Sequence, residues 1–443
     1  MGYRWWALAV VSLGTLTVHL DTTVNVALPA ITNALDAPLP AIQWIIIGYV
    51  LTTAATLVGV GRLTDLVGRR AIWCWGLVAL AAALLLDSLA PTIQVLVACR
   101  ILQAVGATMV YAAGPAIVTE AFPSGERGRA IGIMTMGGQI GMAVGPLLGG
   151  WLVATFGWPA IFWARVPVAA LVGLVSFRVI RDLSRPAGGA RFDVWGSATL
   201  GLAMVTLLFG IDRLGALGWA SWLASGLLAL SALLFGLFVW IERRVAAPVL
   251  DPTLFRDRVF VAANAINLLG NLSMFGLWLL VPYYLAQAQR LEPLMAGLLL
   301  SVVPISSSLL SPLAGWLSDR IGAGRLTLVG LVLQAIALLS MARLDAASPI
   351  VEVVAVLVLL GIAIGVYLAP NISVVMGAVP HDRLGVASGM VATMRSLGVV
   401  TSVALLTSVY AARAALVASA SSDQLDPSAF VVSAFQAAFL VSA

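Results

Sequence analysis

Long apolar runs separated by short polar stretches make up most of this chain. A run of about 20 apolar residues is the length that an α-helix needs to cross the hydrocarbon core of a bilayer. We identify fourteen such runs, at 6–32, 42–61, 72–90, 94–119, 130–155, 159–180, 195–212, 220–241, 259–285, 294–316, 326–342, 350–376, 385–412 and 428–443. The pattern therefore predicts an all-α membrane protein with fourteen spans. The last run is short, so this helix is either truncated or continued in the natural chain.

Composition supports a lipid environment and excludes several chemistries. Apolar residues make up 61% of the chain and charged residues 10%, whereas a soluble domain is about half apolar and a quarter charged. All 24 basic residues are Arg. Without Lys, a Walker-type nucleotide site and a Schiff-base enzyme are excluded. Two His and two Cys suggest no metal cluster, and we expect no cofactor, nucleotide or nucleic acid partner.

The arginines predict how the chain is oriented. If the N-terminus is cytoplasmic and the spans alternate, seventeen of the 24 arginines fall on cytoplasmic loops and their flanks. The other seven, Arg100, Arg165 and Arg395 among them, fall on the outer side or within the membrane. This is the positive-inside bias. It predicts a multi-pass protein of the cytoplasmic membrane with both ends in the cytoplasm.

A short motif in the first half of the sequence recurs in the second half. Residues 61–68 (GRLTDLVG) are echoed at 315–322 (GWLSDRIG). Transporters are commonly built from two such halves. We therefore predict a six-helix bundle at 1–182, a linker with two extra spans at 183–256, and a second six-helix bundle, with its last helix truncated, at 257–443.

Four motifs carry a resemblance to a known family. Residues 61–70 (GRLTDLVGRR) and 96–107 (LVACRILQAVGA) resemble the loop and fourth-span motifs of the major facilitator superfamily. Residues 141–150 (GMAVGPLLGG) resemble the fifth-span motif of its antiporters. Residues 20–29 (LDTTVNVALP) resemble the first-span motif of its fourteen-span drug:proton antiporters. The resemblance covers essentially the whole chain and implies a two-bundle, alternating-access fold plus two linker helices.

The chain departs from the family's motifs at two positions. Leu66 stands where the loop motif usually has Arg, which weakens its charge network. Ala104 stands where the fourth-span motif often has Gly, which we interpret as a tolerated packing change.

Asp21 is the first candidate for chemistry, because it lies near the middle of an apolar run. A carboxylate there costs about 2.5–3.5 kcal/mol on insertion scales, so it must face a cavity, a partner or a proton. Arg100, also within a span, is its natural partner. We expect this pair to couple proton binding to transport, since a proton on Asp21 would cancel its attraction for Arg100. The alternative for Arg100 is a structural clamp between helices.

A second set of residues is expected to gate the transport path. Gly residues recur every four positions on the fifth span and form one stripe on a helix, which allows close packing of two backbones. Asp65 with Arg69 and Arg70 is expected to form a latch between helices rather than a solvated loop, and Asp319 repeats it. The predicted gating residues are Gly61, Asp65, Gly68, Arg69, Arg70, Gly141, Gly145, Pro146, Gly149, Gly150 and Asp319.

Aromatic, amide and charged residues within the spans are candidates for a substrate cavity. The set consists of Trp44, Tyr49, Tyr111, Gln139, Asn267, Trp278, Tyr367, Asn371 and Arg395. Rings with a few amides suit amphipathic or cationic ligands, although individually most of these residues would be core or interface-belt residues. His19 is more often a buried, satisfied side chain than a proton relay.

The expected function is a proton-coupled antiporter, acting as a monomer, that exports small amphipathic or cationic organic molecules. The alternative is an exporter of one endogenous metabolite or antibiotic. Uptake symport is disfavoured by the fifth-span motif. A membrane enzyme would need a catalytic cluster at one membrane face, and we find none. A receptor that transports nothing would bind a ligand without moving protons.

Overall fold

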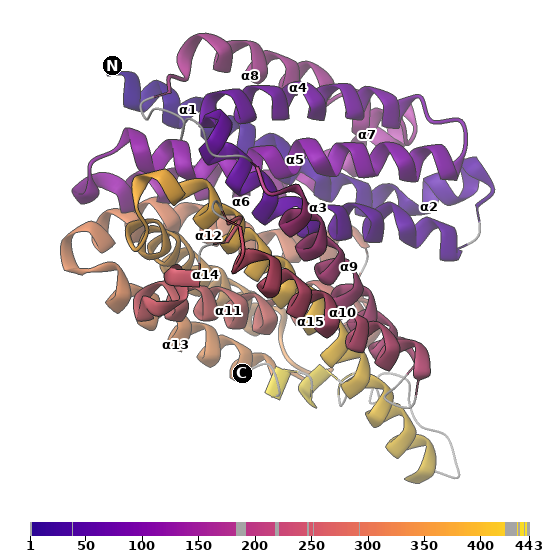
Figure 1. The fold of residues 1–443 in the computed structure, drawn as a ribbon. Helices are drawn as coiled ribbons and strands as arrows, with labels where there is room; N and C mark the ends of the chain where they lie inside the picture. The colour runs from indigo at the N-terminus through magenta and orange to yellow at the C-terminus, as the bar shows by residue number, and fades with distance from the viewer. Residues whose placement is uncertain are drawn as a thin grey trace.

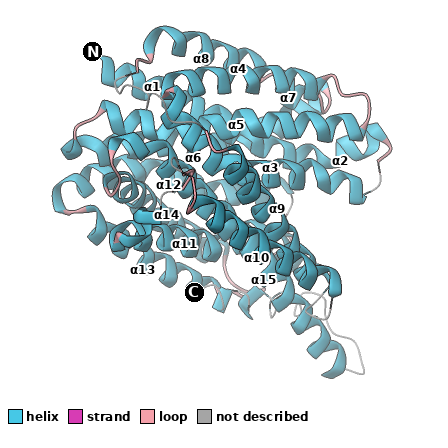
Figure 2. Cartoon of the chain, in the orientation of Figure 1, coloured by secondary structure: helices cyan, strands magenta, loops and turns pink. Residues whose placement is uncertain are grey.

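In the computed structural model, the described residues are 2–37, 39–182, 192–217, 221–245, 248–250, 252–291, 293–420, 432, 435–437 and 439–440. This part of the chain is helical and contains no strand (Figure 2). The first part of the chain forms α1 Tyr3–His19, α2 Thr23–Leu35, α3 Leu39–Val67, α4 Arg69–Ser88, α5 Ile93–Ala121, α6 Arg127–Phe156, α7 Ala160–Trp163 and α8 Val166–Val179. The remainder forms α9 Val194–Leu217, α10 Trp222–Glu242, α11 Arg258–Tyr283, α12 Pro293–Ile321, α13 Ala323–Met341, α14 Ile350–Gly377 and α15 Leu384–Ala420.

Twelve of the described helical segments are long and apolar enough to cross a membrane. Two of the fourteen predicted runs are not among them. The run 259–285 corresponds to α11, a continuous helix of 26 residues. The run 428–443 lies mostly outside the described residues. The structure thus supports twelve spans, and fourteen remains a prediction.

The first predicted span is not one continuous helix. It divides into α1 and α2 around a 3₁₀ turn, η1 (Leu20–Thr22), which contains Asp21. A stretch of 3₁₀ geometry inside a helix often marks a hinge. The sequence pattern suggested an uninterrupted span, because hydrophobicity alone does not report where the backbone tightens.

The loop repeat seen in the sequence has the same backbone geometry in both halves. Gly68 joins α3 to α4 with φ 111°, and Gly322 joins α12 to α13 with φ 95°. Glycine adopts these positive φ values without the penalty of a Cβ. The same tight turn therefore connects equivalent helix pairs.

The helices before α9 and those after α10 meet along two seams. One seam is α6 against α12, and the other is α3 against α15. In Figure 1 the indigo-to-magenta helices lie together on one side and the orange-to-yellow helices on the other. Helix α9 packs against both α3 and α15, and α10 packs against α9. The two linker helices thus lie beside one of the seams.

One end of the helix bundle, called here the basic end, gathers the loop arginines. Arg4 pairs with Glu126, Arg69 with Glu120, and the backbone N–H of Arg70 donates to Asp182. Close approaches between the halves lie at this end. At Gly61 against Gly385, and at Gly128 against Gly315, the opposing backbones leave no room for a Cβ. The two halves are therefore in tight contact at the basic end.

Candidate functional site

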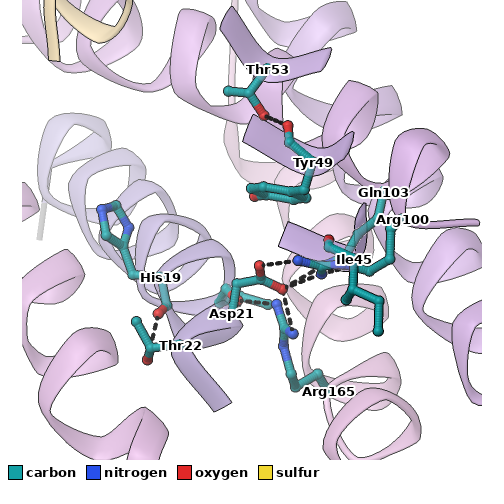
Figure 3. A network of polar contacts seen from close by, with 10 residues as sticks. His19, Asp21, Thr22, Ile45, Tyr49, Thr53, Arg100, Gln103 and Arg165 are labelled. Carbon is teal, nitrogen blue, oxygen red and sulfur yellow. Dashed lines mark hydrogen bonds and ion pairs between the residues drawn. The ribbon is translucent and has the colours of Figure 1, made fainter. Parts of the chain in front are cut away.

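Asp21 lies at the centre of a network of charged hydrogen bonds (Figure 3). Arg100 on α5 donates from Nη1 to Oδ1 at 2.7 Å and from Nη2 to Oδ2 at 2.8 Å. Gln103, one turn further along α5, donates from Nε2 to Oδ1 at 2.9 Å. Arg165, between α7 and α8, donates from Nη1 to Oδ1 at 3.0 Å. Charge-assisted, bidentate bonds of this kind are among the strongest that a protein makes.

Both arginines are more deeply buried than Asp21 and make further contacts that fix their positions. Arg100 is 2% exposed and Arg165 1%. Arg100 also donates from Nε to the carbonyl of Ile45, and its guanidinium carbon lies 4.5 Å from the centroid of the Tyr49 ring. Arg165 donates to the carbonyl of Thr17 on α1. Asp21, whose side chain is 16% exposed, is thus the most accessible member of the ion-pair cluster.

The network confirms that Asp21 and Arg100 are neighbours and adds two residues that the sequence did not single out. Arg165 lies in an apolar run, as Arg100 does, and an intramembrane charge is the signal that could have identified it. Gln103 is part of the motif at 96–107, but its spacing from Arg100 alone does not show that both reach Asp21. One carboxylate therefore faces two guanidinium groups, and these three side chains together carry a net positive charge.

A second cluster joins the two halves near Asp21. The ring of His19 lies 5.5 Å from that of Tyr111, edge to face. Arg395 on α15 places Nη1 3.4 Å from Nε2 of His19, and its guanidinium carbon lies 4.9 Å from the centroid of the Tyr111 ring. His19 points away from Asp21 (Figure 3) and bonds through Nδ1 to the carbonyl of Thr15. Arg395 forms no ion pair with any described carboxylate.

The residues predicted to line a cavity do not gather at one site but lie in different parts of the molecule. Tyr49, Tyr111 and Arg395 belong to the two clusters above. Gln139 is buried on α6. Trp44 is 40% exposed, and its ring lies 6.0 Å from that of Phe209 on α9, so it packs toward the linker helices.

Three other predicted cavity residues pack inside the second half. Asn267 donates to the carbonyl of Val391, Asn371 donates to that of Ala263, and Tyr367 is 1% exposed. The side chain of Trp278 lies outside the described residues. Contact of these residues with a ligand remains a prediction.

The glycine stripe on α6 packs against the segment that carries Asp21. At Gly141 the nearest atom to an added Cβ would be the carbonyl oxygen of Leu16, at Gly145 the hydroxyl of Thr22, and at Gly149 the backbone of Thr23. At Gly150 an added Cβ would make only an ordinary van der Waals contact with Val26. Helix α6 runs unbroken through Pro146. A shift of α6 would therefore press directly on the 3₁₀ turn around Asp21.

Two carboxylates at the basic end connect the halves, and we call them the clasps. Asp65, at the end of α3, accepts hydrogen bonds from the N–H groups of Gly385 at 2.8 Å and Val386 at 3.0 Å, at the start of α15. Asp319, at the end of α12, accepts from the N–H groups of Gly128 at 2.8 Å and Arg129 at 2.9 Å, at the start of α6. Each carboxylate caps a helix N-terminus of the other half, where negative charge is favoured.

The arginines of the loop motif surround the first clasp. Arg69 lies 4.0 Å from Asp65 and 2.5 Å from Glu120, and it donates to the carbonyl of His381 in the other half. Arg70 donates to the carbonyl of Phe177 within its own half. Arg69 therefore contacts both halves, whereas the described contacts of Arg70 fix α4 to the end of α8.

The described residues show no grouping of three His, Cys, Asp or Glu that could hold a metal ion. The polar chemistry of the site is carried by Asp21 and its partners.

Comparison with known proteins relates the whole chain to membrane transporters. A sequence model described as the Major Facilitator Superfamily matches residues 11–403. The chain is 30% identical to the riboflavin transporter RibZ of Clostridioides difficile (strain 630) over 412 residues, covering 93% of this chain and 89% of RibZ. It is 34% identical to the multidrug resistance protein Stp of Mycobacterium tuberculosis (strain ATCC 25618 / H37Rv) over 402 residues, covering 90% of this chain and 74% of Stp.

Two further likenesses extend this comparison. The chain is 30% identical to the tetracenomycin C resistance and export protein of Streptomyces glaucescens over 402 residues, covering 90% of this chain and 74% of that protein. Its fold resembles the crystal structure of the human organic anion transporter MFSD10 (TETRAN), with a TM-score of 0.71 over 100% of this chain and 99% of that one, at 16% identity. At that identity the likeness concerns the fold alone.

Proposed function

Because this chain belongs to the Major Facilitator Superfamily, we propose that it is a proton-coupled antiporter that exports a small organic molecule across the cytoplasmic membrane. The observation that carries the proposal is the cluster of Asp21 with Arg100 and Arg165. A partly accessible carboxylate, held by two guanidinium groups that are almost fully buried, is the kind of intramembrane charge that marks ion and proton pathways. Relatives named as multidrug resistance and antibiotic export proteins support export.

Protonation of Asp21 is the proposed coupling step. A neutral Asp21 accepts weaker hydrogen bonds than a carboxylate, so Arg100 and Arg165 lose their strongest partner. Asp21 lies in the 3₁₀ turn η1, which gives the first span a hinge, and α6 packs on that hinge through its glycine stripe. Proton binding would thus change how α1, α5 and α6 fit together.

The clasps provide the proposed gate. With the basic end facing the cytoplasm, as the arginine distribution predicts, Asp65 and Asp319 hold the two halves together on the cytoplasmic side. Release of these four backbone hydrogen bonds would let that side open. Alternating access requires such a reversible seal, since opening both sides at once would dissipate the proton gradient.

The charges between the halves favour some ligands over others. Asp21 is already paired with two arginines, and Arg395 adds a further positive charge where the halves meet. A cationic ligand would be repelled there, because like charges in a medium of low dielectric interact strongly. Of the two ligand classes predicted from the sequence, the arrangement therefore supports neutral or acidic amphipathic molecules over cations.

The full architecture forms part of the proposal. We propose a monomer with fourteen spans, in which 1–182 and 257–443 form the two bundles and 183–256 the linker. Helix α11 has 26 residues, about 39 Å at 1.5 Å per residue, which is enough for one crossing. If it crosses the membrane, a cysteine placed at Arg290 will react with a thiol reagent added outside, and failure to react would exclude the crossing.

Proteoliposomes with an imposed pH gradient test the coupling. The probes are an acidic, a neutral and a cationic fluorescent dye, with a pH-sensitive dye trapped inside. The wild-type protein should move the acidic or neutral dye against a counterflow of protons. Asp21→Asn should lower this transport by about a hundredfold, as expected for a lost proton-transfer group. Asp36→Asn is the matched control, because Asp36 is an exposed Asp that caps the C-terminal end of α2, and its positive φ suits Asn.

Other outcomes would separate the alternatives. Dye transport by Asp21→Asn with the wild-type pH dependence would refute coupling at this residue. Binding of a dye without any proton movement would indicate a receptor. Transport of only one compound out of a large panel would indicate an exporter of one metabolite or antibiotic. Arg395→Gln should reduce transport of the acidic dye more than that of the neutral dye.

A further inference from the structure

A second carboxyl group lies close to the Asp21 cluster, and the transport step described above leaves it without a role. Asp87 is in the last turn of α4 and is 0% exposed. Neither of its carboxyl oxygens has a hydrogen-bond partner among the described residues. Burying a charged carboxylate without any donor is very unfavourable, and the C-terminal end of a helix disfavours negative charge further. Asp87 therefore fits its site as a neutral, protonated acid.

Asp87 interacts electrostatically with the cluster around Asp21. The charges that act on it are those of Arg100, Asp21 and Arg165. Among the elements that pack on α4, α5 contributes Arg100 and Cys99, and Arg165 stands at the junction of α7 and α8. From α3, Tyr49 lies against Arg100. Asp87 is thus a second carboxyl group that the charges of these two guanidinium groups act on.

Arg165 has an unused hydrogen-bond donor, and Asp87 has two unused acceptors. Its Nη1 and Nη2 groups bond to Asp21 and Thr17, but its buried Nε–H has no acceptor. All three nitrogens of Arg100, in contrast, are bonded. Near Asp21 there is therefore one buried guanidinium N–H without an acceptor, on Arg165, and one buried carboxyl group without a donor, on Asp87.

Charge balance explains why a second acid is needed. If Asp21 alone took up a proton, two buried arginines would be left with no counter-ion, which is strongly unfavourable. We propose that Asp87 is a second proton-binding site that passes its proton to Asp21 and then takes over Arg165 as its ion-pair partner. This inference rests on the proton coupling proposed above and adds the donor of the proton.

The proposed step conserves protons and charge. The O–H bond of Asp87 breaks, and the proton forms an O–H bond on the carboxylate of Asp21. The hydrogen bond from Arg165 to Asp21 is replaced by one from Arg165 to the new carboxylate of Asp87. The four side chains carry one net positive charge before and after the transfer. Asp21 then releases its proton, and only after that is Asp87 reprotonated, from the end of α4 opposite the basic end, where Leu89 and Thr92 are exposed. One of the two acids therefore stays ionised throughout.

Infrared difference spectroscopy of the full chain in lipid nanodiscs tests the protonation of Asp87 directly. At neutral pH, the wild-type minus Asp87→Asn spectrum should contain the C=O stretching band of a neutral carboxylic acid. Ser88→Ala, which changes the neighbouring hydroxyl on the same turn, should keep that band. A difference spectrum that shows only carboxylate bands would overturn the proposal. If Asp87→Asn does not fold, Asp87→Glu should move the acid band instead, and an unmoved band would also overturn it.

Transport assays test the relay. Asp87→Asn should lower proton-driven transport by about a hundredfold, whereas Ser88→Ala should behave as wild type. Wild-type rates in Asp87→Asn would refute the relay while leaving coupling at Asp21 intact. If instead the wild-type protein moved no protons but showed the acid band of Asp87, the antiport proposal would fail and the proton site would stand.

Discussion

At the basic end, the two halves of the protein use the same device. Asp65 at the end of α3 and Asp319 at the end of α12 each cap the first helical N–H groups of a helix in the opposite half. In the interior the halves differ. The first half buries Asp21, Arg100 and Arg165 in one cluster, whereas the buried polar side chains described between Asn264 and Ser402 are amides and hydroxyls.

This difference fits two separate functions, which are sealing the contact between the halves and binding protons. A seal between the halves benefits from symmetry, because each half contributes one carboxylate and one helix start. A proton switch needs titratable groups in only one place, and a second buried ion cluster would add a desolvation cost without a new function. We therefore interpret the first half as the site of the proposed proton chemistry, whereas the second half contributes the positive charge of Arg395 beside His19. Four tests, with five substitutions, probe this contrast.

The largest effect is expected for Arg100→Gln. It leaves Asp21 with fewer donors in a buried site, and breaking a buried ion pair costs about 3–5 kcal/mol. Urea unfolding of the purified protein in detergent measures the loss of stability. The control is Arg4→Gln, whose pair with Glu126 is exposed and worth about 0–1 kcal/mol. Equal losses in the two variants would show that the interior cluster does not stabilise the first half.

Gly145→Ala probes the contact between the glycine stripe and the turn around Asp21. The added methyl group would collide with the hydroxyl of Thr22, and such overpacking costs about 1–3 kcal/mol. Gly297→Ala in the second half is the control, since its Cβ would meet open space. The gate proposal predicts slower dye transport for Gly145→Ala only. Normal stability and rate in this variant would argue against it.

Gln334→Met measures an amide of the second half. Gln334 donates to the carbonyl of Gly270 at 2.9 Å and to the hydroxyl of Ser273 at 2.6 Å. Losing such neutral bonds should cost about 0.5–1.5 kcal/mol, which is less than the loss in Arg100→Gln. Proton-driven transport should keep its pH dependence. A changed pH dependence would show that the second half also takes part in coupling.

The smallest effects are expected for Asp65→Asn and Asp319→Asn. A carboxylate at a helix N-terminus is worth about 0.3–1 kcal/mol beyond a neutral cap. Hydrogen exchange should speed up at the amides of residues 385 and 386 in Asp65→Asn, and at those of 128 and 129 in Asp319→Asn. Each variant serves as the control for the other. An increase at both places in both variants would mean that the clasps open together.

The sequence predicted the twelve spans that the structure supports, because lipid imposes length and apolarity on every crossing helix. It also identified Asp21 and Arg100 as a pair, since buried charges need partners. It did not reveal the 3₁₀ turn at Asp21, because backbone tightening leaves no hydropathy signal. Arg165 was visible as an intramembrane charge, but its approach to Asp21 depends on how α7 and α8 pack against α1.

The surroundings of two further residues could not be predicted for a similar reason. Trp44 fits a cavity by type and depth, yet the structure packs it against Phe209, because α9 covers that side of α3. Asp87 resembles a residue at a span boundary, and only packing shows that its carboxyl group is enclosed. Tertiary contacts between distant segments decide these cases, and no local pattern encodes them.

The clasps also set limits on how this seam can change over evolutionary time. Each carboxylate accepts from peptide N–H groups, so these hydrogen bonds do not depend on the side chains of Val386 and Arg129. Arg129 is exposed and can vary, whereas Val386 is 0% exposed and is constrained by its packing in the core. Proline is the one replacement that removes the donor. Gly385 and Gly128 lack this freedom, because the opposing backbone fills the space that a Cβ would need. A mutational scan should find Arg129 tolerant beside an intolerant Gly128, and both Gly385 and Val386 intolerant.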